Sequence, residues 1–223
     1  MPAAPANAER PRRARLSVSE RETQLLDIAE KLFTERGFDG VTIEDIARAA
    51  QVTRPVVYQR YGSKESVFIA CVRRAREHCD RMVFDRVAAA PDNIAARIKA
   101  GCAAYCDIIT TDPRRFNLLF TTSANLDGTL AEELRYLRQG SINSTVETVR
   151  PYVPELSDEA LTAFAYAVSG IGEQLGRWLL ANPKMSRKKF VAYYTAAIEG
   201  VANSILAMPQ AARRRRGGRT HRP

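Results

Sequence analysis

Hydrophobic positions along most of the chain recur every three to four residues, which is the spacing of amphipathic α-helices. In the clearest stretch, apolar side chains fall at i, i+3, i+4, i+7 and i+8. These side chains are Leu25, Ile28, Ala29, Leu32 and Phe33. Sustained apolar/polar alternation, the signal of half-buried strands, is absent from the sequence. The pattern therefore predicts an all-α protein.

Polar residues at the ends of these stretches predict where the first helices begin and end. Ser17 is followed three residues later by Glu20, the spacing of a capping box, and Gly37 suits the end of that helix. A short second helix is predicted to start at Thr42, because Asp45 repeats the same capping arrangement.

The stretch VTRPVVYQRYGSKESVF, residues 52–68, predicts a third short helix and the start of a fourth. Thr53 is a suitable N-cap, and Pro55 is tolerated in the first helical turn, where its missing N–H has no intrahelical partner. Gly62 would stop the helix, and Ser63 would cap the next one. A short helix, a tight turn and a second short helix that exposes arginine and tyrosine form a helix-turn-helix, which places its second helix in the DNA major groove.

These elements give residues 17–70 a resemblance to the DNA-binding domain of the TetR (tetracycline-repressor) family of bacterial transcription regulators. The resemblance is carried by AEKLFTERGFDGVTIEDIARAAQVT followed by VVYQRYGSKESVF. The shared order is a helix, Gly-Phe, a threonine at the next helix start, Ile-Ala, a tyrosine, and a lysine six residues later. Tyr61 replaces the family's usual phenylalanine and Arg60 a frequent histidine, so the base preference is not carried over.

The resemblance implies roles for individual side chains, and their chemistry agrees with it. Hydroxyls, lysine and helix N-termini suit phosphate, while arginine can grip a guanine edge in bidentate fashion. By resemblance Thr42, Tyr58 and Lys64 would bind phosphates, and residues 53–55 would face bases or nearby backbone. Alternatively, the two threonines are only N-caps. The candidate DNA contacts are Thr42, Thr53, Arg54, Pro55, Tyr58, Gln59 and Lys64.

The net charge of +9 lies entirely in the two ends of the chain. Residues 1–16 hold four arginines and one glutamate, residues 208–223 hold six arginines, and residues 17–207 are neutral. We interpret both ends as flexible basic segments. The first precedes the DNA-binding helices, so Arg12, Arg13 and Arg15 are possible minor-groove contacts. For the second, a solubility tail remains an alternative.

The rest of the chain predicts further helices, ending in two long ones that begin after Ser157 and Ser186. Each carries an apolar stripe and a second, small-residue face, which favours two sets of partners. The family pairs its last two helices with their symmetry mates, which implies a homodimer here; close packing within one monomer is the alternative. The small-residue faces consist of Ala163, Ala167, Gly170 and Gly172, and of Tyr193, Ala196, Gly200 and Ser204.

The family commonly holds a small-molecule effector among its middle helices, which implies a ligand site of low polarity here. An aromatic stripe at helical spacing is also typical of plain core. The cysteine pair at i and i+4 could bind metal or sense oxidation, but His78 is the only histidine nearby, so we interpret these thiols as buried and inert, with no metal or cofactor. The candidate lining residues are Cys102, Tyr105, Cys106, Phe116 and Phe120.

The sequence thus predicts four segments: a basic arm (1–16), a three-helix DNA-binding domain (17–64), a larger helical effector and dimerisation domain (65–207) and a basic tail (208–223). No nucleotide-binding loop, zinc-protease or serine-hydrolase motif is present, so we expect no catalytic residues and no enzyme. No apolar run suits a membrane span or signal peptide, which predicts a cytoplasmic protein. The interpretation is a dimeric repressor of a palindromic double-stranded operator, released by an apolar effector. Alternatives are a helical protein-interaction module and a regulator without a ligand.

Overall fold

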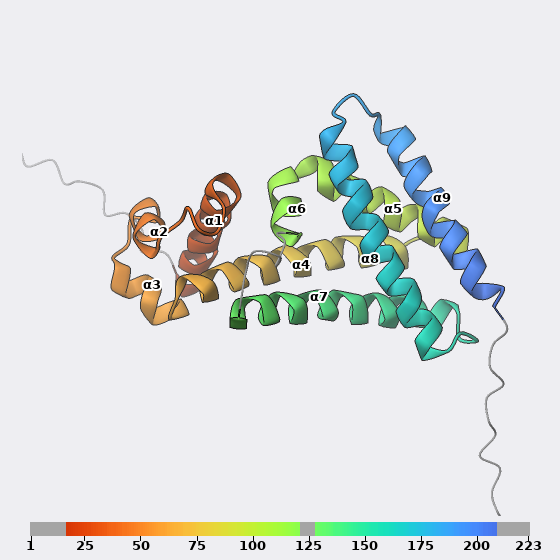
Figure 1. Cartoon of the computed structure of the whole chain (residues 1–223), viewed down its shortest axis with the longest axis horizontal. Coiled ribbons are helices and arrows are strands. Elements are labelled where there is room, and N and C mark those ends of the chain that lie inside the picture. The colour runs from red at the N-terminus through yellow and green to blue at the C-terminus, as the bar shows by residue number, and fades with distance from the viewer. Residues whose placement is uncertain (1–16, 121–127, 209–223) are drawn as a thin grey trace, which may run out of the picture. The chain divides into compact units, whose positions relative to one another are not determined.

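The computed structural model describes residues 17–120 and 128–208. The predicted arm, with Arg12, Arg13 and Arg15, and the tail from residue 209 onward lie outside the described residues. The described part consists of helices and their connections, with no strand (Figure 1), which confirms the all-α prediction. The chain divides into two compact units, one up to Phe68 and one from Ile69.

Unit 1 contains three complete helices and the beginning of a fourth, and its helix starts follow the predicted caps. These are α1 (Val18–Arg36), α2 (Ile43–Ala49), α3 (Arg54–Tyr61) and the first residues of α4 (Lys64–Ala88). Both capping boxes are present: the Glu20 N–H donates to Ser17 Oγ and the Asp45 N–H donates to Thr42 Oγ1. Thr53 is the N-cap of α3 by position, but its side chain makes no capping hydrogen bond to any described residue.

The connection between α2 and α3 is a Schellman motif, and it fixes where α3 begins. The Val52 N–H donates to the Ala47 carbonyl at 3.0 Å, and the Gln51 N–H donates to the Arg48 carbonyl at 3.2 Å. In this motif the first residue after the C-cap adopts the left-handed conformation, and glycine is the residue that usually occupies it. Here Gln51 occupies it with φ 56°. The turn of the helix-turn-helix therefore carries backbone strain at a residue with a side chain.

A β-branched residue at this turn should destabilise unit 1. We expect Gln51→Ile to lower the free energy of unfolding by about 1–2 kcal/mol relative to Gln51→Gly, because the branched side chain clashes in the left-handed region. Urea unfolding followed by circular dichroism measures the difference. Ala49→Ile, at an exposed helical position two residues earlier, is the control and should cost about 0.5 kcal/mol or less. Equal stability of the Ile and Gly variants would contradict a left-handed residue at this turn.

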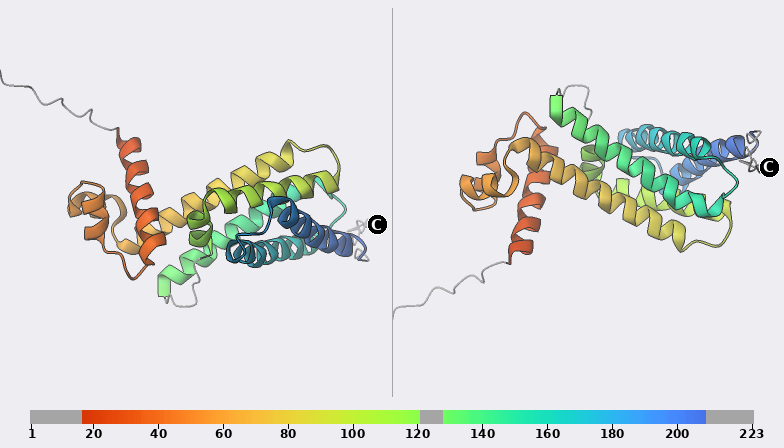
Figure 2. Two further views of the ribbon diagram at one scale, coloured as in Figure 1. Left: turned by 90° about the horizontal axis from the view of Figure 1, so that it is seen from above. Right: turned by 90° about the horizontal axis from the view of Figure 1, so that it is seen from below.

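Unit 2 is an assembly of long helices. The continuation of α4 is paired with α5 across a short connection, as the two views of Figure 2 show. Helix α9 packs against α5 and α8, and α8 also packs against α7. The elements are α5 (Ile94–Thr111), α6 (Pro113–Leu119), α7 (Gly128–Val149), a 3-10 turn η2 (Arg150–Tyr152), α8 (Asp158–Ala181) and α9 (Arg187–Leu206).

Two glycines of α8 allow aromatic rings to approach the helix backbone. A Cβ atom at Gly176 would lie 2.3 Å from Phe116 Cζ, and one at Gly172 would lie 2.9 Å from the Tyr194 hydroxyl. Gly172, which the sequence places on the small-residue face of this helix, is buried against Tyr194 of the same chain and so is not available to a symmetry mate. In the described part of the chain, no helix has both the length and the apolar content needed to cross a bilayer.

Candidate DNA-binding surface and ligand cavity

Helix α3 presents one exposed polar face. Of its residues Val57 is completely buried and fixes the helix to unit 1, whereas the predicted base-facing side chains all remain accessible to solvent. The Tyr58 ring is 44% exposed, and the Arg54 guanidinium lies 6.0 Å from its centroid. The exposed candidates on α3 and its N-cap are Thr53, Arg54, Pro55, Tyr58 and Gln59.

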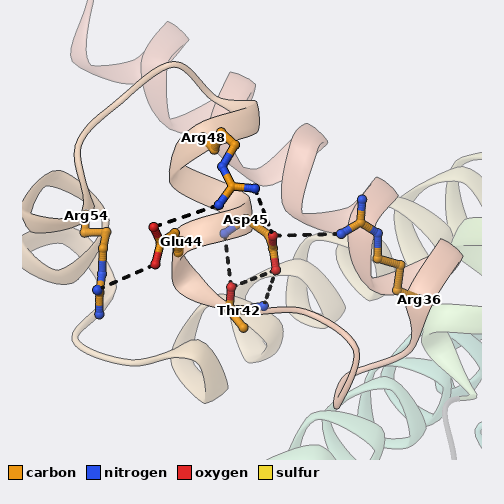
Figure 3. Close-up of polar contacts among 6 residues, drawn as sticks. All are labelled: Arg36, Thr42, Glu44, Asp45, Arg48 and Arg54. Carbon is orange, nitrogen blue, oxygen red and sulfur yellow. Dashed lines mark hydrogen bonds and ion pairs between the residues drawn. The ribbon is translucent and has the colours of Figure 1, made fainter.

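Arg54, the candidate for reading a base, belongs to an ion-pair network. Figure 3 shows the Glu44 carboxylate between Arg48 and Arg54, at 3.9 Å and 3.7 Å respectively. Asp45 continues the network toward Arg36 at 3.9 Å. Exposed pairs of this kind contribute about 0–1 kcal/mol each, so an arginine can leave Glu44 for a base or a phosphate at little cost. This network was not predicted from the sequence.

Two of the predicted phosphate contacts already have intramolecular partners. Thr42 Oγ1 donates to Asp45 Oδ2 at 2.7 Å, and the Thr42 N–H donates to the same oxygen at 3.1 Å. Both hydrogen bonds lower the pKa of the Asp45 carboxyl. Lys64 Nζ donates to the Phe38 carbonyl at 3.1 Å and lies 4.1 Å from the centroid of the Phe38 ring. A lysine ammonium has three donors, so Lys64 can still meet a phosphate from this fixed position. The predicted roles of both residues stay predictions.

Arg60, one of the two residues that depart from the family pattern, has an ion-pair partner on another helix. Arg60 forms an ion pair with Glu22 and thereby connects α3 to α1. This pair raises the pKa of the Arg60 guanidinium. Tyr61 is half-buried beside it. Both residues therefore contribute to the position of α3 within unit 1.

A cavity of about 220 Å³ lies within unit 2, among side chains of α4, α5, α7, α8 and α9. Three predicted lining residues, Cys102, Tyr105 and Phe120, face it. The other two, Cys106 and Phe116, belong to the adjoining hydrophobic core and are completely buried there. Most of the wall is apolar, which suits a small-molecule site with few polar groups. The cavity wall also contains the charged residues Arg76, Asp80 and Arg97, which were not predicted from the sequence.

All four cysteines are buried free thiols. Burial raises the pKa of Cys102 and of Cys79 to about 12, and it also raises the pKa of Cys106. At neutral pH these thiols are therefore protonated, and a protonated thiol is a poor metal ligand and a poor nucleophile. Within residues 17–120 and 128–208, no group of three or more His, Cys, Asp or Glu side chains could hold a metal ion.

Helices α8 and α9 expose a surface of small and aromatic side chains. Trp178 is 40% exposed and Tyr193 is 49% exposed, and their ring centroids lie 6.1 Å apart. Both helices also carry exposed or half-exposed small residues. We call this surface the outer face of α8 and α9; it consists of Ala163, Ala167, Gly170, Trp178, Tyr193, Ala196, Gly200 and Ser204.

Comparisons with known proteins agree with the exposed helix-turn-helix. Residues 25–71 match the sequence profile described as "Bacterial regulatory proteins, tetR family". The HTH-type transcriptional activator FasR of Mycolicibacterium smegmatis is 27% identical over 135 residues, which are 60% of this chain and 61% of that protein. The HTH-type transcriptional repressor KstR2 of Rhodococcus jostii is 49% identical over 49 residues, which are 22% of this chain and 24% of that protein.

The whole fold also has a counterpart among solved structures. The crystal structure of the transcriptional regulator FadR from Bacillus subtilis in complex with stearoyl-CoA superposes with a TM-score of 0.67. That match covers 80% of this chain and 96% of the other at 12% identity, so it concerns the fold alone. The two sequence relatives are matched over less than two thirds of their own lengths.

Proposed function

The chain belongs to the TetR family of bacterial regulatory proteins, and on that basis we propose that it is a DNA-binding transcription regulator that acts in the cytoplasm. The observation that carries the proposal is the solvent exposure of Arg54, Tyr58 and Gln59 on α3, a helix whose Val57 is buried. Thr42 and Lys64 would bind phosphates beside it, and the arginines of residues 1–16 would add contacts to the DNA.

We propose that two copies of the chain bind one near-palindromic operator. The outer face of α8 and α9 supports this, because it exposes the aromatic rings of Trp178 and Tyr193, and aromatic side chains are enriched at protein interfaces. A twofold axis through this face would pair α8 and α9 with their symmetry mates and present two α3 helices to the DNA. The half-sites would then lie about 34–36 Å apart, or a multiple of that distance.

We propose that a small, largely apolar ligand in the cavity of unit 2 releases the operator. A ligand shifts such an equilibrium only through different affinities for the DNA-binding and DNA-free states. Support comes from the apolar cavity wall and from the stearoyl-CoA bound to the Bacillus subtilis FadR, which shares the fold. We propose that binding to the operator represses transcription. The Rhodococcus jostii relative is named a repressor, whereas the Mycolicibacterium smegmatis relative is named an activator.

Selection of bound sequences from a random pool of duplex DNA tests the proposed function. We expect the full-length chain to select a near-palindrome. The Arg54→Ala variant should bind about 1–3 kcal/mol more weakly and accept all four bases at one position of each half-site, because a bidentate contact to guanine is lost. Tyr58→Phe should weaken binding to all DNA sequences to a similar extent, because a phosphate contact carries no sequence information.

Two outcomes distinguish the alternatives. If Arg54→Ala selects the same motif as the unchanged chain, Arg54 does not read a base. If the unchanged chain selects no motif and its retention on DNA does not fall with added salt, a helical protein-interaction module becomes the better interpretation.

A further inference from the structure

Helix α2 carries an exposed carboxylate, Glu44, next to a residue that is proposed to contact DNA. The side chain of Glu44 is 58% exposed. Double-stranded DNA carries one negative charge for about every 1.7 Å of its axis, so it repels a nearby carboxylate. Glu44 therefore lowers the affinity for DNA unless its interactions within the protein offset this repulsion.

The Glu44 carboxylate lies between the guanidinium groups of two arginines, as Figure 3 shows. Its Oε1 atom is 3.9 Å from Nη2 of Arg48, and its Oε2 atom is 3.7 Å from Nη1 of Arg54. Arg54 is the first residue of α3, and the N-terminal residues of the second helix contact base edges in a helix-turn-helix. Glu44 thus connects α2 to the side chain that is proposed to read a base.

The ion pair with Glu44 leaves the hydrogen-bond donors of Arg54 available. A separation of 3.7 Å exceeds the length of an N–H···O hydrogen bond, which is about 2.7–3.2 Å, so the contact is electrostatic. A guanidinium carries five N–H donors, and a bidentate contact to a guanine edge uses two of them. Arg54 can therefore contact guanine while its charge stays next to the carboxylate.

A phosphate and a guanine edge differ in charge, and Glu44 distinguishes between them. The O6 and N7 acceptors of guanine belong to an uncharged base and carry only partial charges, so the carboxylate repels them weakly. A phosphate at the same guanidinium would be a second anion beside the carboxylate, and two like unit charges at close range repel each other. Glu44 therefore reduces the attraction of Arg54 for phosphate more than its attraction for guanine.

Loss of the Glu44 charge would affect Arg54 more than Arg48. Arg48 also lies 3.8 Å from Asp45, and hydrogen bonds from Thr42 fix the Asp45 carboxylate. For Arg54, Glu44 is the one carboxylate at ion-pair distance among the described residues. Without the Glu44 charge, Arg54 would be an exposed cation that any DNA phosphate could bind.

We propose that Glu44 is a specificity-determining residue, whose carboxylate holds Arg54 for a guanine edge and disfavours its capture by DNA phosphates. Glu44 is a positioning residue, because it acts through Arg54. Non-specific complexes consist of phosphate contacts, so Glu44 weakens them more than it weakens the operator complex. This inference rests on the proposed function, since it takes Arg54 as a base-reading residue.

The variant Glu44→Gln removes the charge, keeps the length of the side chain and tests the inference in the full-length protein. The operator obtained by selection and a random duplex of equal length are titrated by fluorescence anisotropy at pH 7.5 and several KCl concentrations. Affinity for the random duplex should rise about threefold per copy of the chain, and so about tenfold for a dimer. Operator affinity should rise by less than about twofold, so the ratio of the two affinities falls by at least about fivefold. For the random duplex, the slope of log affinity against log salt should steepen by about 0.9 for each phosphate that Arg54 gains.

A double variant shows whether this effect passes through Arg54. General repulsion between Glu44 and DNA acts on both duplexes and largely cancels in the ratio of their affinities. In the Arg54→Ala background, Glu44→Gln should therefore change the ratio by less than about twofold. Glu35→Gln removes a carboxylate from an exposed position of α1 and is the matched control. It should leave the ratio unchanged.

The possible failures of the inference and of the proposed function are distinguishable. A ratio that Glu44→Gln does not lower, or lowers equally with and without Arg54, would overturn the inference and leave the proposed function standing. Loss of a preferred cytosine in the operator selected by Glu44→Gln would show that Glu44 itself reads a base, and would also overturn it. If the unchanged chain prefers no sequence, the proposed function is contradicted and this inference with it.

Discussion

The substitution Ala196→Arg should abolish dimerisation and weaken operator binding by at least about a hundredfold. Ala196 lies in the middle of the outer face of α8 and α9. In a twofold interface the substitution occurs twice, and each copy places an unpaired charge against an apolar partner at a cost of about 3–5 kcal/mol. A monomer holds one α3 helix and can occupy only one half-site. Analytical ultracentrifugation gives the oligomeric state, and fluorescence anisotropy with a labelled operator gives the affinity.

A matched substitution away from the outer face separates this effect from a general effect of charge. Ala95 is an exposed alanine on α5, and Ala95→Arg should leave both the dimer and the operator affinity unchanged. Loss of dimerisation in both variants would indicate misfolding, which circular dichroism would detect. A dimer that persists in Ala196→Arg would show that the two copies associate through another surface.

Replacing Phe116 by alanine should cost about 3–5 kcal/mol of the free energy of unfolding. The ring is completely buried, and it contacts Tyr105, Phe120 and the backbone of α8 at Gly176. Its removal leaves a cavity that the surrounding helices cannot fill. Differential scanning calorimetry should record a loss of about 10 °C in Tm. Tyr136→Ala, at a side chain that is 74% exposed, should change the free energy of unfolding by less than about 0.5 kcal/mol.

The close approach of Phe116 to Gly176 makes the two positions interdependent. Gly176→Ala alone should destabilise by about 1–3 kcal/mol, because its methyl group would overlap the Phe116 ring. In the Phe116→Ala background the same methyl group has room, and alanine is the better helix former by about 1 kcal/mol. A double-mutant cycle should therefore give a favourable coupling of at least about 1 kcal/mol. Additive effects would contradict this packing.

The local features of unit 1 could be predicted from the sequence because their signals are short-range. A capping box needs only Ser17 and Glu20 three residues apart, and a proline in the first helical turn marks the start of α3 wherever the helix lies. The same helical periodicity left Val56 and Val57 as alternatives for the inward position, and Val57 is the buried one. The N-cap hydrogen bond expected from Thr53 is the exception, since backbone position alone does not determine the side-chain rotamer.

Features that depend on partners from distant helices were predicted less completely. Whether a residue of α5 lines the cavity depends on which helix lies opposite: Cys102 and Cys106, one turn apart, belong to the same core cluster, but only Cys102 also lines the cavity. Likewise, Gly172 satisfied the small-residue pattern, but Tyr194 occupies the space in front of it. One signal was available in the sequence: the charged pair Arg76 and Asp80 interrupts an otherwise apolar row of α4.

The burial of every cysteine makes the chain a convenient host for site-specific labels. Maleimides and methanethiosulfonates attack thiolates, and a protonated thiol inside the core offers them neither the ionised form nor access. A single cysteine introduced at an exposed position such as Ala49 would be modified while Cys71, Cys79, Cys102 and Cys106 remain unmodified. Pulsed electron paramagnetic resonance between two nitroxides, one on each copy, would then report the distance between the two α2 helices, and so between the two helix-turn-helix units, in solution without and with added effector.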